Sequence, residues 1–195
     1  MALLTASSKG RGIGKRLARP GAASLLVALL LAGLNSPARA ETSAEYRLKA
    51  AFLFNFAQFV KWPPRAFPQP QTPLVIGILG DDPFGSGLDE IVRGEQVNSR
   101  PLAVQRYRSL EEIKICHVLF ISRSEADRAA QIVSSLKGRG VLTVGDAEGA
   151  AMRGIMIRFA TENNKIRLKI NLEAAKGSEL TISSKLLRLA DLVAP

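Results

Sequence analysis

Apolar residues recur at helical spacing near residue 50 and in short consecutive runs further along the chain. Residues 44–61 are continuously compatible with a helix, and Trp62 followed by two prolines ends it, because proline lacks an amide donor and displaces its predecessor from the helical region. The favoured interpretation is a helix covered on two sides by its own fold, and the alternative is a helix that also meets a partner. Its apolar stripe consists of Leu48, Phe52, Phe56, Phe59 and Val60, widened by Leu53 and Phe54.

Short runs rich in branched apolar residues follow, each separated from the next by a helical segment. The run at residues 74–79 is typical of a buried parallel strand. Strands that alternate with helices of this size predict right-handed crossovers and a mostly parallel sheet. The expected strands are residues 74–79, 102–107, 116–121 and 141–144, and the expected helices run to residue 92, from residue 109 and over residues 124–136.

The last third of the chain has a different pattern. Residues 155–160 and 165–170 are strand-like and joined by a polar turn, which predicts an antiparallel hairpin on one edge of the sheet. A final helix is expected from Ser183 or Ser184, either of which can cap it. We therefore expect an α/β fold, a single three-layer domain with a mostly parallel sheet, flanking helices and a C-terminal antiparallel hairpin. The stripe of the final helix consists of Ile182, Leu186, Leu189, Ala190 and Val193.

The first forty residues have the order of a secretory signal peptide. A basic start precedes an apolar run at residues 22–34, and the segment ends in an Ala-x-Ala sequence at Ala38 and Ala40. This order predicts a signal peptide of residues 1–40, cleaved after Ala40, and an exported periplasmic domain of residues 41–195. An uncleaved anchor is the alternative. The leader holds six Lys/Arg and no acidic residue, so the net charge falls from +10 to +4 on cleavage, and nucleic-acid binding is not expected.

The sequence lacks a catalytic set. Cys116 is the only cysteine, which rules out an internal disulfide, and His117 is the only histidine. Because neighbours on a strand point to opposite faces of the sheet, these two side chains cannot form a nucleophile pair, and a zinc site lacks its other ligands. We expect structural roles for both residues, no enzyme activity, no metal and no cofactor.

One loop has the character of a ligand site. Gly80, Asp81 and Asp82 follow the strand at residues 74–79, and ligands favour the carboxyl ends of parallel strands. Two aspartates disfavour a phosphate and favour a cation or an amine. The alternative, a capped tight turn without a ligand, is the preferred interpretation of this loop. A periplasmic small-molecule receptor is accordingly the second functional hypothesis.

Three segments together resemble the YfiR family of small exported bacterial proteins. They are residues 46–63, residues 78–85, and residues 170–172 together with residues 183–190. The resemblance covers essentially the whole mature chain, and Cys116 stands at a family cysteine position. It implies a homodimeric, non-catalytic α/β protein that binds the periplasmic part of an inner-membrane diguanylate cyclase and represses it. Cyclic-di-GMP signalling and biofilm formation then fall, and an outer-membrane lipoprotein can draw the regulator away.

The resemblance also implies which residues meet a partner. The chain departs from the family at three points: Lys169 replaces an acidic residue, Ala175 is smaller than its counterpart, and further family cysteines are missing. Redox control through a disulfide is therefore not expected. The candidate partner-binding residues are Lys61, Trp62, Arg106, Asn171, Leu172 and Ala175.

Overall fold

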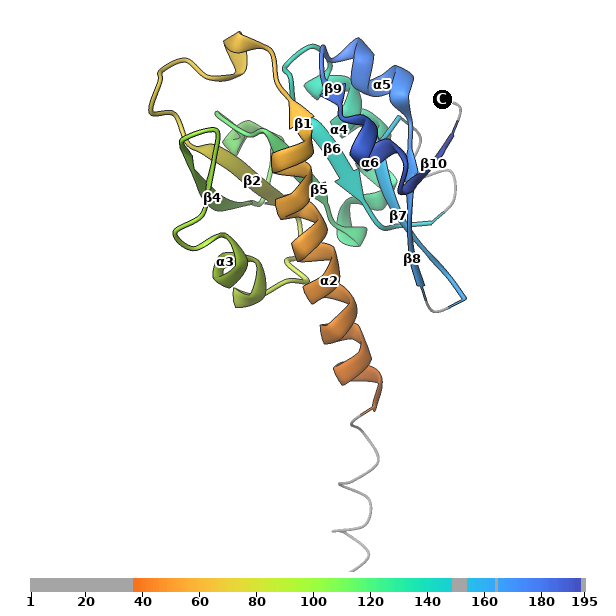
Figure 1. Cartoon of the computed structure of the whole chain (residues 1–195). Coiled ribbons are helices and arrows are strands. Elements are labelled where there is room, and N and C mark those ends of the chain that lie inside the picture. Colours follow the sequence, from red (N-terminus) through yellow and green to blue (C-terminus); the bar gives the residue numbers. More distant parts are fainter. Residues whose placement is uncertain (1–36, 149–153, 164, 194–195) are drawn as a thin grey trace, which may run out of the picture. The chain divides into compact units, whose positions relative to one another are not determined.

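The computed structural model describes residues 37–148, 154–163 and 165–193 (Figure 1). Residues 40–195 form one compact unit. Nearly all of the predicted signal peptide lies outside the described residues. None of the helices in the described part of the chain has the length and apolar character needed to span a bilayer.

The described residues form an eight-stranded sheet in the order β10-β8-β7-β6-β5-β2-β4-β3. Neighbouring strands from β4 to β7 run parallel, and β7 and β8 form the expected antiparallel hairpin. This arrangement confirms the predicted α/β fold. The strands of this sheet are β2 (Leu74–Leu79), β3 (Gln96–Val97), β4 (Arg100–Tyr107), β5 (Val118–Ile121), β6 (Leu142–Gly145), β7 (Ile157–Glu162), β8 (Lys165–Ile170) and β10 (Ala190–Leu192).

Helices cover both faces of the sheet, as Figure 1 shows. The main core lies between the sheet and α2 (Pro37–Phe59) together with α3 (Ser86–Val92). The second core lies on the other face, under α4 (Ala129–Leu136). The remaining described elements are the short strands β1 (Val60–Lys61) and β9 (Thr181–Ile182), the helices α5 (Leu172–Gly177) and α6 (Ser184–Leu187), and the 3-10 turns η1 (Pro64–Ala66), η2 (Leu110–Glu112) and η3 (Arg123–Arg128).

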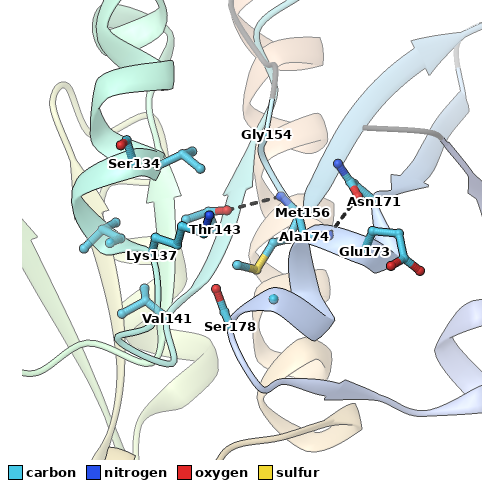
Figure 2. Close-up of a pocket in the computed structure, with 13 residues that line it drawn as sticks. Ser134, Lys137, Val141, Thr143, Gly154, Met156, Asn171, Glu173, Ala174 and Ser178 are labelled. Carbon is cyan, nitrogen blue, oxygen red and sulfur yellow. Dashed lines mark hydrogen bonds between the residues drawn. The ribbon is translucent and has the colours of Figure 1, made fainter.

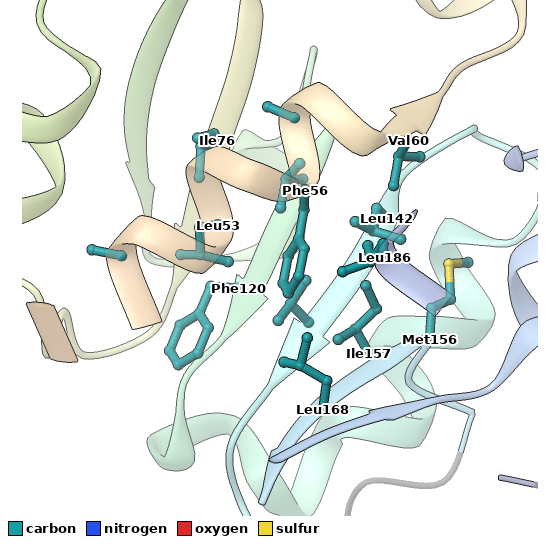
Figure 3. Packing of buried hydrophobic residues seen from close by; sticks show 14 of the residues in the cluster. Leu53, Phe56, Val60, Ile76, Phe120, Leu142, Met156, Ile157, Leu168 and Leu186 are labelled. Carbon is teal, nitrogen blue, oxygen red and sulfur yellow. The ribbon is translucent and has the colours of Figure 1, made fainter. Parts of the chain in front are cut away.

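The buried stripe of α2 differs from the predicted one. Leu48 is 51% exposed, and Phe52 and Phe59 are only half-buried. The face against the sheet instead carries Leu53 and Phe56, which pack on strand residues of the main core (Figure 3). The stripe is rotated by one residue because α2 is apolar around much of its circumference, so spacing alone does not select the face. The buried side chains of α2 are Lys49, Ala50, Leu53, Phe56 and Ala57.

The predicted final helix is wrong beyond its first turn. Helix α6 ends at Leu187, and the chain then pairs as β10, parallel to β8. Leu189 is 70% exposed and therefore lies off the expected buried stripe. The edge of β8 offers backbone partners that a helix would leave unused: the amide of Val193 donates to the carbonyl of Ile170 at 3.0 Å.

Other boundaries move by short distances. Helix α2 begins at Pro37 rather than at residue 44, and it ends at Phe59 because Val60 and Lys61 pair with β9. The helix expected from residue 109 is only the 3-10 turn η2, whereas the helix expected from residue 124 begins as η3 and continues as α4. Strands β5 and β7 each begin two residues later than predicted.

Candidate functional site

Two of the predicted partner-binding residues follow α2 directly. Lys61 lies opposite Thr181 in the β1–β9 pair, and its side chain is exposed. Trp62 is half-buried, and its indole Nε1 donates to the carbonyl of His117 at 3.1 Å. His117 precedes β5, so both residues lie at the amino ends of the parallel strands.

Three further predicted residues belong to α5, a helix that the sequence pattern did not reveal. The Asn171 side chain caps it by accepting a hydrogen bond from the amide of Ala174 at 3.0 Å, which satisfies one of the free amides of the first turn. Asn171 and Ala175 are buried, whereas Leu172 is half-buried against the main core. Leu172 is therefore the one of these three whose side chain is substantially accessible to a partner.

Strand β9 joins these two groups of residues. The chain leaves α5 with the amide of Leu180 bonded to the carbonyl of Ala175 at 3.0 Å and then pairs with β1. Figure 1 shows β1, β9 and α5 together at one end of the sheet. We define the amino-end surface as the accessible side chains of Lys61, Trp62, Leu172, Glu173 and Lys176.

A cavity of about 380 Å³ lies between α4 and α5 (Figure 2). Its wall includes Val141, Met156 and Ala174, and Thr143 is held in place because its Oγ1 accepts a hydrogen bond from the amide of Met156 at 3.2 Å. No pattern in the sequence predicts this cavity, since its lining comes from three separate segments, residues 133–143, 154–156 and 171–178, that only the tertiary fold brings together.

Arg106 lies at the opposite end of the sheet, near the end of β4. Its guanidinium pairs with Asp82 at 2.7 Å and with Asp89 at 2.5 Å, and it also donates to the carbonyl of Gly85 at 2.8 Å. The hydrogen bond from Arg106 lowers the pKa of the Asp89 carboxyl. The structure thus separates Arg106 from the amino-end surface and binds it to the loop that follows β2.

The loop at residues 80–82 is occupied by contacts within the chain. Gly80 has a φ of +87°, and a Cβ there would collide with the Ser124 hydroxyl, so this position requires glycine. The amide of Asp81 donates to the Ser124 Oγ at 2.9 Å. Asp82 accepts from the amide of Phe84 at 2.7 Å, in addition to its pair with Arg106. Of the two aspartates, only Asp81 presents an exposed side chain.

Cys116 and His117 face opposite sides of the sheet. Cys116 belongs to the second core, whereas the His117 ring stacks on Phe67 with centroids 4.4 Å apart. Both ring nitrogens of His117 are engaged: Nδ1 accepts from the amide of Val75 at 3.1 Å, and Nε2 donates to the carbonyl of Ala66 at 3.0 Å. The imidazole is therefore held neutral in one tautomer, with no nitrogen left for proton transfer.

We expect stability to fall on acidification because of His117. Burial lowers the pKa of its imidazole from 6.5 to about 4. The unfolded chain therefore binds this proton more readily than the folded one, so this contribution is unchanged above pH 6.5 and is lost between pH 6.5 and about 4. The loss should reach about 2 kcal/mol at pH 5 and approach about 3 kcal/mol only near pH 4 and below. Denaturant unfolding at pH 7 and pH 5 measures the first of these values. His117→Asn cannot titrate and should flatten the dependence, and an equally steep dependence in that variant would contradict the assignment.

We expect the Cys116 thiol to be unreactive in the folded protein. The residue is 7% exposed, and burial raises the pKa of its thiol to about 12. The thiolate that attacks a disulfide reagent is therefore scarce at neutral pH. An aromatic disulfide reagent should label Cys116 only after denaturation, and Cys116→Ser should leave regulation intact at a modest cost in stability. Rapid labelling of the native protein would refute this prediction.

A known protein family covers most of this chain. A family model described as YfiR/HmsC-like matches residues 46–191, which is nearly all of the compact unit. No curated protein matches the chain.

Proposed function

This chain belongs to the YfiR/HmsC-like family of periplasmic regulators of diguanylate-cyclase signalling, and on that premise we propose its function. It is a non-catalytic periplasmic protein that binds the periplasmic part of an inner-membrane diguanylate cyclase. Binding holds the cyclase inactive and lowers cyclic-di-GMP signalling and biofilm formation. The observation that carries this proposal is the family match over residues 46–191, from the first helix to the last strand.

We place the cyclase on the amino-end surface. This surface combines a half-buried aromatic, Trp62, with the half-buried Leu172 and the exposed charge of Lys61. Interfaces commonly have this composition, with apolar anchors at the centre and charges at the rim. Arg106 has a different role in this proposal: its two ion pairs fix the loop after β2 to α3.

The absence of catalysis is also part of the proposal. Its support is that the single histidine has both nitrogens occupied by backbone groups, and that the single cysteine is buried with a raised pKa. Two further expectations come from the family: the protein is a homodimer, and an outer-membrane lipoprotein competes with the cyclase for it.

Crosslinking followed by pull-down of the tagged protein from membranes tests this function. A diguanylate cyclase among the captured proteins is the expected result, and deletion of that cyclase should abolish the effect of the regulator on cellular cyclic-di-GMP. A matched capture with the Leu172→Asp variant should lose the cyclase. Capture without a cyclase, together with unchanged cyclic-di-GMP in a strain lacking the regulator, would overturn the proposal.

We predict that export removes residues 1–40. Ala40 ends the Ala-x-Ala sequence and lies in the first turn of α2. The periplasmic protein should then begin at Glu41. Intact-mass measurement of the protein from the periplasmic fraction checks this directly. A membrane-embedded product that keeps its leader would contradict the prediction and favour the anchor.

A further inference from the structure

A second group of charged residues lies at the carboxyl ends of the parallel strands. Asp146 follows β6, Arg123 follows β5, and Glu45 and Lys49 extend from α2. This is the end of the sheet opposite the amino-end surface (Figure 1). In parallel α/β sheets, ligands favour the carboxyl ends of the strands.

Asp146 is the centre of this group, and its side chain is 1% exposed. Its Oδ2 accepts from the ammonium of Lys49 at 2.5 Å and from the hydroxyl of Tyr46 at 2.8 Å. Its other oxygen, Oδ1, is buried and has no hydrogen-bond partner among the described residues. Arg123 forms only a loose ion pair with it: its Nε lies 3.4 Å from Oδ1, and its side chain is 60% exposed. A buried carboxylate oxygen without a close hydrogen bond is costly, so a closer donor at this atom would be stabilising.

A cavity of about 440 Å³ opens beside this oxygen. Four carboxylates supply negative charge to its wall, those of Glu45, Asp146, Glu148 and Glu162, and Arg123 and Arg158 supply positive charge. Arg158 forms no ion pair with any residue in the described part of the chain, and the Glu45 carboxylate is 31% exposed although it contacts Lys49 at 2.6 Å. The cavity thus has at its base a carboxylate oxygen that is only loosely paired, and at its walls two arginines among further carboxylates.

We propose that this cavity binds a small zwitterion of the α-amino-acid type. Its ammonium group donates to the Asp146 Oδ1 and lies near Glu45, and its carboxylate pairs with Arg123 and Arg158. A simple anion would meet four carboxylates, and a simple cation would meet the two arginines, so a molecule with one charge of each sign fits best. Arg123 is free to turn from Asp146 towards the ligand carboxylate because most of its side chain is exposed.

Calorimetric titration of the purified protein with each common L-amino acid, one at a time, tests this site. At least one should bind saturably with a Kd of about 1 mM or tighter. For that amino acid, Arg123→Ala and Arg158→Ala should each weaken binding at least about tenfold, because each removes a charge-assisted contact. Arg128→Ala, an exposed arginine of the same 3-10 turn that does not line the cavity, should leave the Kd unchanged.

Two single-charge probes separate a zwitterion site from simpler ones. Butylamine and butyrate should each bind at least about tenfold more weakly than the amino acid, since each lacks one of the two ionic contacts. The proposal is overturned if no amino acid binds saturably, if either single-charge probe binds equally well, or if the Arg123 and Arg158 variants bind with the wild-type Kd. Equal weakening by Arg128→Ala would likewise overturn it, because the effect would then be one of general charge.

Discussion

Replacing Asp146 with alanine is expected to lower the free energy of unfolding by about 3 kcal/mol. The variant leaves the ammonium of Lys49, whose side chain is 1% exposed, without its closest partner. It also removes the acceptor of the Tyr46 hydroxyl. Glu45 remains 2.6 Å from Lys49 and keeps the loss at the lower end of the range for broken buried ion pairs. Denaturant unfolding at neutral pH measures the change.

Two further variants show whether burial of the charge is the cause. Glu162→Ala breaks a pair with Lys169, but the Glu162 side chain is 48% exposed, so the free energy of unfolding should fall far less than in Asp146→Ala. The double variant Lys49→Met, Asp146→Leu removes both charges and should recover most of the lost stability, because an apolar pair carries no desolvation penalty. If the double variant is as unstable as Asp146→Ala, the buried ammonium is not the source of the loss.

The same ion pair shows where sequence reasoning reached its limit. Lys49 stands four residues before Leu53 and four after Glu45, so it lies on the stripe that the structure buries. A helix that is apolar around much of its circumference permits more than one buried face. A lysine side chain is charged and usually lies at the protein surface, so the sequence favours a face without Lys49. Only its partner, Asp146, 97 residues away in sequence, makes burial of this ammonium favourable. A partner at that separation leaves no periodic signal.

Elements with a clear apolar pattern were predictable, whereas α5 and β10 depended on hydrogen bonds to other parts of the fold. Strands β2, β7 and β8 have six residues each, and their clear apolar patterns allowed all three to be predicted. Helix α5 and strand β10 were not predicted, and each is fixed by contacts outside itself: Asn171 caps α5, and β8 supplies the partners of β10. Local spacing cannot reveal such elements, since their stabilising groups lie elsewhere in the fold.

The candidate partner-binding residues could be named from the sequence, but their positions relative to one another could not. Family resemblance pointed to six residues. In the structure, Lys61, Trp62 and the α5 segment lie at one end of the sheet, and Arg106 lies at the other. It also buries Asn171 and Ala175, which therefore act by shaping α5. Burial is a property of the packed fold, and no short motif encodes it.

The largest functional effect is expected from Leu172→Asp. Apolar anchors dominate interfaces of this kind, so a charge at Leu172 should weaken association with the cyclase by about 2 kcal/mol or more, a factor of about 30. Cells that carry the variant should show raised cyclic-di-GMP. Lys61→Ala should weaken the affinity for the cyclase less than Leu172→Asp, because an exposed charge at the rim contributes mainly to the association rate. Affinity for the captured cyclase and cellular cyclic-di-GMP are the measurements.

Stability must be measured alongside, because Leu172 packs partly against the main core and its replacement should cost about 1–2 kcal/mol by itself. Leu189→Asp is the matched control: it places the same charge on a leucine that is 70% exposed and outside the amino-end surface, and it should repress normally. A Leu172→Asp protein that is folded at the assay temperature and still represses would refute the amino-end surface as the cyclase interface. If it is unfolded at that temperature, Leu172 acts in the core, and the assignment of this residue as an anchor is wrong.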